Sequence, residues 1–569
     1  MAVPGWCGAS ALAEYGRVIK SVMDDPAEFK AEKASGGKRV LKNFNELQGR
    51  LTAEALKALN DGELKLLAEA LGHVGLFRGD KDVARAFEAL FRELGSRELI
   101  SREAAGYLQL AYIDARMFSE ARELLEKYPQ YDLNFVPEVL DAAGPTAGRK
   151  VYEIDPEVAL IKSAAVPQLD KGSQVLFVGS VFCNISVNSA AFIEGNEALK
   201  GLASNFIALS NNFAPAQLAK WNKAHSIKFR LPYDRGGWAG FDLSRTPGIY
   251  MLRDGKVVYQ LDGWDISGGA RLAEGLFRAG LLDFDGYVET LKYAADSLSA
   301  AGESFEDRVA AGREIYALLS PKVKKAELKK ASDKTLETAF YLAADALING
   351  ASLKPLKEIS RLFSEMERRG SVKKNIAENL YDYYLDSREF KAAAALAKKY
   401  PDFKYPPVPE MIRNKRTAGP AHRVYEVQAG GVRAEVTKLE PWAGPKIIVT
   451  GVPGCGATKR AFGDIEKDPA LSELFSRHGV FITWNSYFKS VAAWNEKHAT
   501  KAYIAYLRSD WPELGVYSSP VFYFFKDGKL LETSRGGWGD AAGMAEKLKG
   551  LKAIGLLWEP EKVNSGLMN

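Results

Sequence analysis

Apolar residues recur along the chain with two different periods, and each period occupies its own stretches. From about residue 45 to 143, and again from about 290 to 415, apolar positions return every three to four residues, which predicts amphipathic helices. The segment 102–129 shows this pattern and ends on a proline, a residue that stops helices. We expect both stretches to form pairs of antiparallel helices.

The remaining stretches alternate apolar strands with helices. The first has strands at 174–180 and 205–210, each followed by a helix, at 188–203 and 214–225. A β-hairpin turned at Asp254-Gly255 and a closing helix at 270–282 complete it. Parallel βαβ units followed by an antiparallel hairpin predict a mixed sheet with helices on both faces.

These stretches form two copies of one pattern. LKALNDGEL from Leu56 matches LKKASDKTL from Leu328, an offset of 272 residues (328 − 56). Cys183 and Cys455 keep this offset, and the hairpin turns follow at 273. Agreement over about 200 residues predicts a tandem duplication.

The predicted fold class is therefore α/β plus all-α, a duplication of a helical-hairpin domain joined to a mixed sheet flanked by helices. A chain of 569 residues is too long for one core. The expected parts are an N-terminal helical extension at 1–45, helical domains at 46–145 and 286–415, sheet domains at 150–285 and 422–560, and a tail at 561–569.

Composition excludes several classes of protein. The hydrophobic fraction of 47% and charged fraction of 26% are those of a soluble globular protein. A net charge of +5 without a long basic tract predicts no nucleic-acid partner, and no apolar run is long enough for a membrane span. Three cysteines form no disulfide framework, and five scattered histidines predict no metal site. We expect no cofactor.

The first ten residues, MAVPGWCGAS, lack the basic start and apolar core of a signal peptide. The expectation is a cytoplasmic protein, or a periplasmic or exported one if a signal peptide precedes residue 1. Cys7 lacks a preceding strand, and the sequence assigns it no role. The sequence also leaves the oligomeric state open.

Candidate chemistry centres on two cysteines. Cys183 and Cys455 each follow an apolar strand and precede a helix, and a hydroxyl residue, Ser186 or Thr458, stands three positions later. A cysteine at the N-terminus of a helix is next to unpaired N–H groups and the helix dipole, which favour the thiolate.

The segments 151–283 and 424–558 resemble the thioredoxin superfamily, and in particular its periplasmic thioredoxin-like (TlpA-like) proteins. The resemblance rests on the strand, the Cys-x-x-Ser/Thr motif and helix, an X-Pro before the hairpin, and the Asp-Gly-Lys turn ending in Gly-Trp. The helical stretches are similar to tetratricopeptide repeats. Family members act on thiols and disulfides of polypeptides, which implies protein partners at the cysteines or on the helical surface.

The resemblance also implies site residues. In the family a cis proline stands beside the reactive cysteine and the backbone before it pairs with a substrate peptide, which assigns substrate binding to two dipeptides, Thr246-Pro247 and Ser519-Pro520. The thiol chemistry falls to the two Cys-x-x-Ser/Thr motifs, residues Cys183, Ser186, Cys455 and Thr458.

Both copies depart from the family pattern. The second cysteine, which resolves a mixed disulfide, is replaced by serine or threonine. The buried acidic residue six positions before the cysteine is Phe177 or Val449, and the preceding tryptophan is Phe182 or Gly454. Each site therefore retains a single thiol.

Several functions stay open. One is monothiol exchange or isomerisation, with the hydroxyl residue donating a hydrogen bond to the thiolate. Another is a non-catalytic interaction protein in which the cysteines are inert. A third is a thiol peroxidase. Ser180 fits the peroxiredoxin motif, but Leu176 stands where that motif has a proline. Residues 451–458 nearly spell a phosphate loop, but Ala457 replaces its lysine.

Overall fold

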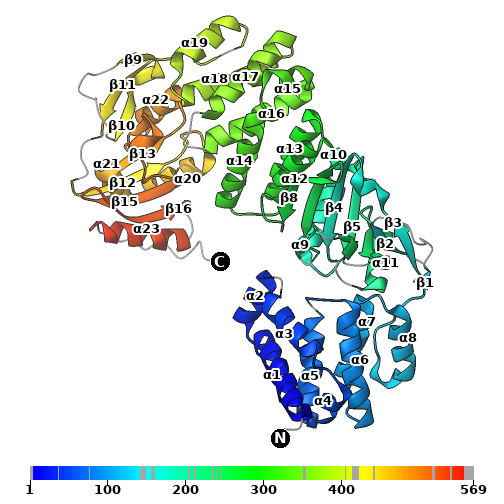
Figure 1. Ribbon diagram of the computed structural model, residues 1–569. Helices are drawn as coiled ribbons and strands as arrows, with labels where there is room; N and C mark the ends of the chain where they lie inside the picture. The colour runs from blue at the N-terminus through cyan, green and yellow to red at the C-terminus, as the bar shows by residue number, and fades with distance from the viewer. Residues whose placement is uncertain are drawn as a thin grey trace. The chain divides into compact units, whose positions relative to one another are not determined.

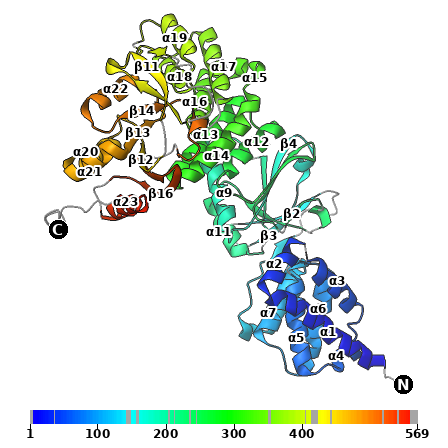
Figure 2. The ribbon, with the colours of Figure 1, turned by 90° about the vertical axis from the view of Figure 1, so that its left-hand side faces the viewer.

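A computed structural model divides the chain into two compact units, Met1–Asp283 (unit 1) and Phe284–Asn569 (unit 2), drawn in Figures 1 and 2. Each unit starts with helices and ends with an eight-stranded mixed sheet. The structure describes residues 4–35, 37–75, 77–140, 149–155, 160–202, 205–210, 213–233, 236–238, 240–243, 245–349, 354–403, 405–412, 422–439, 443–515, 520–537 and 541–556. Two expectations lie outside these ranges, Ser519 and the tail at 561–569, and the side chain of Cys7 is also not described.

The helical half of unit 1 contains α1 (Pro4–Asp24), α2 (Pro26–Ala34), α3 (Lys38–Gln48), α4 (Ala53–Lys57), α5 (Asp61–Val74), α6 (Lys81–Ser96), α7 (Arg102–Asp114) and α8 (Phe118–Lys127). Helices that follow one another in the sequence pack together, as α5 with α6, α6 with α7 and α7 with α8 do.

The sheet half of unit 1 follows. Its elements are β1 (Val139–Leu140), β2 (Lys150–Ile154), β3 (Ile161–Ala165), β4 (Ser173–Gly179), α9 (Asn184–Gly195), α10 (Glu197–Lys200), β5 (Phe206–Ser210), α11 (Pro215–Ala224), β6 (Phe229–Pro232), β7 (Gly248–Arg253), β8 (Lys256–Asp262) and α12 (Gly268–Ala279).

Unit 2 repeats this succession. Its helical half contains α13 (Phe284–Ala300), α14 (Phe305–Leu319), α15 (Lys325–Lys330), α16 (Asp333–Asn349), α17 (Lys354–Arg369), α18 (Lys374–Asp386) and α19 (Phe390–Lys399). Its sheet half contains β9 (Glu410–Ile412), β10 (Arg423–Val427), β11 (Arg433–Lys438), β12 (Pro445–Thr450), α20 (Gly456–Lys467), α21 (Pro469–His478), β13 (Gly479–Thr483), α22 (Phe488–Lys497), β14 (Ala502–Ala505), β15 (Val521–Lys526), β16 (Lys529–Arg535) and α23 (Ala541–Ala553).

The two sheets have the same strand order. It is β1-β3-β2-β6-β5-β4-β7-β8 in unit 1 and, read from the other edge, β9-β11-β10-β14-β13-β12-β15-β16 in unit 2. In both, the strand before the cysteine pairs parallel with its successor and antiparallel with the first hairpin strand. The start of α9 or α20 is thereby fixed beside the loop that enters the hairpin.

The expectation of helices on both faces of each sheet is wrong for the described α-helices. Along β4, Val175 and Phe177 belong to the core cluster that contains α9, α11 and α12, whereas Leu176 and Val178 pack on the other face against Trp238. The crossovers from β4 to β5 and from β5 to β6 run in the same direction, and right-handed crossovers then place both helices on one face. Unit 2 has the same division, with Trp511 in the place of Trp238.

One arginine connects the two halves of each unit. Arg116 and Arg388, 272 residues apart, follow α7 and α18 with positive φ angles of 60° and 65°. Arg116 Nε donates to the carbonyl of Pro232, at the end of β6, over 3.0 Å. Arg388 donates to the carbonyls of Tyr506, Trp484 and Ala505 and to the hydroxyl of Ser486. We name this contact the arginine joint.

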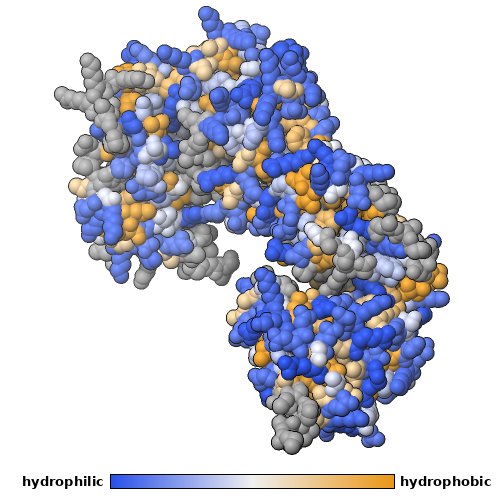
Figure 3. All heavy atoms as spheres, viewed as in Figure 1, coloured by the Kyte–Doolittle hydropathy of each residue, from blue (hydrophilic) through white to orange (hydrophobic). Residues whose placement is uncertain are grey.

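The face of the molecule drawn in Figure 3 is mainly polar. On the face drawn in Figure 3, hydrophilic side chains cover most of each unit, and apolar side chains form small separate patches. No described helix is both long enough and apolar enough to span a bilayer.

Candidate functional site

Cys183 lies at the N-cap of α9, directly after the turn that ends β4. Its backbone N–H donates to the carbonyl of Ser180 over 3.1 Å, and its own carbonyl accepts from Val187 over 3.0 Å. The half-buried thiol is 3.8 Å from the carbonyl oxygen of Thr246, 63 residues further along the chain. The Thr246–Pro247 peptide bond is cis. The cysteine and the loop before β7 therefore form one site, site 1.

The environment of Cys183 favours its thiolate. Burial alone raises the pKa of the thiol, but hydrogen bonds from the backbone N–H and hydroxyl of Ser186 and from Thr246 outweigh it, and the pKa lies below its ordinary value. The backbone N–H of Ile185 also contributes to this lowering of the pKa. These groups are backbone N–H groups in the N-terminal turn of α9 and the neutral side-chain hydroxyls of Ser186 and Thr246, so the stabilisation comes from hydrogen bonding.

Ser186 occupies the position of a resolving cysteine. Its side chain is buried with 1% exposure, and its Oγ accepts from the backbone N–H of Ser180 over 3.3 Å. Ser189, one turn later, donates instead to the carbonyl of Ser186. The Ser186 hydroxyl thus joins the end of β4, the start of α9 and the thiol.

Cys455 has the same backbone setting in unit 2. It is the N-cap of α20, its N–H donates to the carbonyl of Val452 over 2.9 Å, and its carbonyl accepts from Lys459. The thiol is half-buried, and Thr458 is fully buried. Pro520 directly precedes β15, while its partner Ser519 lies outside the described residues. We name the Cys455 region site 2.

The structure shows what occupies the positions where the family pattern has other residues. Phe177 and Val449 are fully buried within β4 and β12, so each core is apolar where a carboxylate would accept a proton. Phe182, before Cys183, is 61% exposed. Gly454 is its counterpart and is also exposed. Both sites consequently lack a carboxylate proton relay at that position.

Two partial motifs, that of a thiol peroxidase and that of a phosphate loop, lie in turns that lead into α9 and α20. The Oγ of Ser180, the residue that fits the peroxidase motif, accepts from the N–H of Phe182 and thus shapes the turn. In the segment 451–458, α20 starts only at Gly456, and the exposed Lys459 lies in its first turn. Among the described residues, no cluster of His, Cys, Asp and Glu side chains is arranged to hold a metal ion.

A glutamate at the far end of the cysteine helix is a feature that sequence analysis missed. Glu194, in the last turn of α9, accepts from Ser226 N, Ser226 Oγ and Ile227 N, over 2.6, 2.8 and 3.0 Å. Its second oxygen is 2.7 Å from Nδ1 of His225, which caps α11 and stacks on Trp221. These bonds fix the end of α9 opposite to Cys183.

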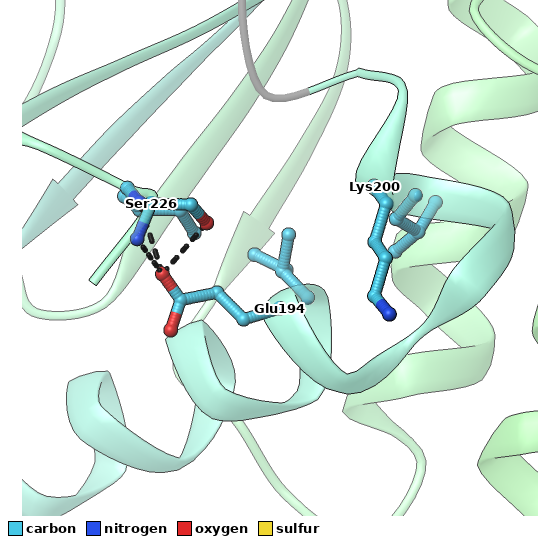
Figure 4. A pocket seen from close by; sticks show the side chains of 6 residues that line it. Glu194, Lys200 and Ser226 are labelled. Carbon is cyan, nitrogen blue, oxygen red and sulfur yellow. Dashed lines mark hydrogen bonds between the residues drawn. The ribbon is translucent and has the colours of Figure 1, made fainter. Parts of the chain in front are cut away.

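The same glutamate lines a pocket of about 350 Å³. In Figure 4 its carboxylate points toward Ser226, while Lys200 lies on the other side of the pocket. Unit 2 repeats the pair, with Glu466 2.6 Å from Nδ1 of His498. The spacing of the two glutamates, 272 residues (466 − 194), equals that of the cysteines and is the sequence signal that could have revealed them.

Two solved structures are among those that resemble the chain. One is a thioredoxin-like protein from Bacteroides caccae ATCC 43185, with 13% identity over 49% of this chain and 94% of that chain, and a TM-score of 0.17. The other is the pentatricopeptide repeat protein PPR10 from maize, with 12% identity over 70% of this chain and 59% of that chain, and a TM-score of 0.14. At these TM-scores neither likeness carries an argument. No family model and no curated protein matches the chain.

Proposed function

We propose that the protein carries out monothiol thiol–disulfide exchange on polypeptide partners through Cys183 and Cys455. The sheet half of each unit then serves as a thioredoxin-like domain, and the helical half as a repeat-like domain beside it. The observation that carries the proposal is the setting of Cys183, a half-buried thiol at an N-cap, with a lowered pKa and 3.8 Å from the carbonyl of Thr246.

The chemistry needs no second thiol in the same site. The Cys183 thiolate attacks one sulfur of a partner disulfide, a new S–S bond forms, and the other partner sulfur leaves as a thiolate. Because Ser186 replaces the resolving cysteine, a second thiol of the partner must attack the mixed disulfide. Exchange that ends on the same partner is isomerisation. In this proposal the backbone of Thr246 aligns an extended partner segment beside the thiol, a role supported by the 3.8 Å distance between the Thr246 carbonyl oxygen and the Cys183 sulfur.

The test is the pH dependence of alkylation of Cys183 in the full chain carrying Cys7→Ser and Cys455→Ser. We expect a midpoint below the value of a free cysteine, about 8.5, and trapped mixed disulfides with peptide disulfides. A midpoint at or above that value, or protection until the chain unfolds, would contradict the proposal. That result would favour a protein that binds partners without thiol chemistry.

A further inference from the structure

The two cysteines have the same backbone setting but opposite side-chain surroundings. In site 1, the first turn of α9 carries no charged residue, and the residues near Cys183 in the sequence include the exposed Phe182 and Ile185, with exposed fractions of 61% and 46%. Arg245, next to Thr246, forms ion pairs with Asp242 and Asp262, so its charge is offset.

Site 2 is cationic. The positions equivalent to Val187 and Asn188 are Lys459 and Arg460, both exposed. Lys459 is four residues after Cys455, the spacing that places side chains on one face of a helix. Within the described residues, neither Lys459 nor Arg460 forms an ion pair. Two positive charges without an ion-pair partner among the described residues therefore lie at the start of α20, four and five residues after Cys455.

The guanidinium of Arg460 lies close to the first residue of α20. A Cβ built on Gly456, the residue directly after Cys455, would lie 3.5 Å from a guanidinium nitrogen of Arg460. The guanidinium thus folds back toward the N-terminus of α20, where the dipole adds further positive potential. At the equivalent position of α9 stands Asn184, which carries a side chain.

We infer that Cys455 is selective for disulfides that carry negative charge beside the sulfur atoms, whereas Cys183 has no such preference. This inference rests on the proposed thiol–disulfide exchange and adds its substrate class. The Cys455 thiolate attacks the nearer sulfur of an anionic disulfide, the Cys455–S bond forms, and the other half leaves as a thiolate. The charges of Lys459 and Arg460 attract the carboxylates of the disulfide during the approach.

The experiment compares three aliphatic disulfides: the dianionic dithiodiglycolate, the dicationic cystamine, and the neutral 2-hydroxyethyl disulfide. Exchange rates are measured in full chains that retain one cysteine, either Cys7→Ser/Cys183→Ser or Cys7→Ser/Cys455→Ser. At an ionic strength near 0.01 M, we expect the anionic-to-cationic rate ratio to be about fivefold higher for Cys455 than for Cys183. This difference should shrink strongly near 1 M salt, where charges are screened.

Two matched variants locate the cause. Lys459→Gln/Arg460→Gln changes exposed side chains only and should bring the ratio for Cys455 down to that of Cys183. Val187→Lys/Asn188→Arg should give Cys183 the anionic preference. Equal ratios for the two cysteines, or a ratio unchanged by the glutamine variant, would overturn the inference. Exchange with the neutral disulfide no faster than that of a free cysteine peptide at both sites would instead refute the proposed function itself, and the inference with it.

Discussion

Unit 1 and unit 2 share a backbone and differ in the charges placed on it. Both have the same strand order, a cysteine at an N-cap, a glutamate–histidine pair at the far end of the cysteine helix, and an arginine joint. The first turns after the cysteine are neutral in α9 and cationic in α20. The comparison teaches that the geometry of a thiol site and its electrostatics can vary independently.

A second difference lies in the helical halves. Asp382 of α18 stands where α7 has Leu110. Burial, together with the negative charges of Asp386 and Glu378, raises the pKa of Asp382 to about 6. Unit 2 therefore contains a carboxyl group that is costly to ionise, and unit 1 contains a leucine at that point.

The largest expected effect tests whether the arginine joint matters equally in both units. Arg388→Ala leaves several carbonyls and Asp386 without the guanidinium and should destabilise unit 2 by about 3 kcal/mol. Hydrogen exchange of peptides from β13, β14 and α18 measures the loss. Arg388→Lys, which keeps the charge but not the fork, should recover only part of it. Arg116→Ala should likewise lower the stability of unit 1. If only one of the two variants is destabilised, the joint does not have the same role in both units.

The next effect compares the two glutamates. Glu194→Ala removes bonds to Ser226, Ile227 and His225 and should cost about 2 kcal/mol, whereas Glu466→Ala, whose described partner is His498, should cost about 1 kcal/mol. Although burial raises the pKa of Glu194, its bonds to His225, Ile227 and Ser226 outweigh this and lower it. Its contribution is therefore present above about pH 4.3 and is lost as the pH falls through its folded-state value. Urea unfolding of both variants at pH 7 and pH 3.5 measures the two losses of stability and their dependence on pH.

A smaller effect of opposite sign should follow from Asp382→Leu, which copies Leu110 of unit 1. With a folded-state pKa of about 6, Asp382 holds its proton in the folded chain while the unfolded chain ionises, so stability falls as the pH rises from about 4 to 6. The variant should gain about 1 kcal/mol at pH 7, allowing for solvent around a half-buried side chain. The free energy of unfolding is measured at pH 4 and pH 7. If it changes between these pH values as much in the variant as in the wild type, the prediction is contradicted.

The smallest effect concerns site 1 alone. Ser186→Ala removes one of the hydrogen bonds that lower the pKa of Cys183, so the thiolate fraction at pH 7 should fall and alkylation should slow about threefold. Ser189→Ala is the matched control, because its hydroxyl donates to a carbonyl of the same helix. Equal rates for the two variants would show that the Ser186 hydroxyl does not reach the thiolate.

Much of the fold could be predicted because the spacing of apolar residues along the chain determines where helices and strands form. The run of Val175, Leu176, Phe177 and Val178 marks a strand buried on both faces, and all four side chains are fully buried. The placement of the helices could not be predicted this way, because it depends on the order in which strands join the sheet. The division of each unit into separate domains stays a prediction.

Less of the site could be predicted. The sequence indicates a cysteine at each strand-to-helix junction, and Cys183 and Cys455 both lie at an N-cap. The contact of Cys183 with Thr246 spans 63 residues and followed only from the family resemblance. Glu194 was missed because a glutamate near the end of a helix is ordinary by composition. Only its tertiary partners, in the segment after α11, distinguish it.

The arginine joint has a consequence for which residues can differ between the two units. Most acceptors of Arg388 are main-chain carbonyls, at Tyr506, Trp484 and Ala505, and the acceptor of Arg116 at Pro232 is one as well. Every residue type supplies a carbonyl, so the side chains at these positions are free to mutate while the attachment persists. Pro232 and Ala505 occupy equivalent positions and are already different residues. The main-chain part of the joint therefore depends on the arginine and not on the side chains of its carbonyl acceptors, whereas Ser486 and Asp386 contribute side chains to the joint of unit 2.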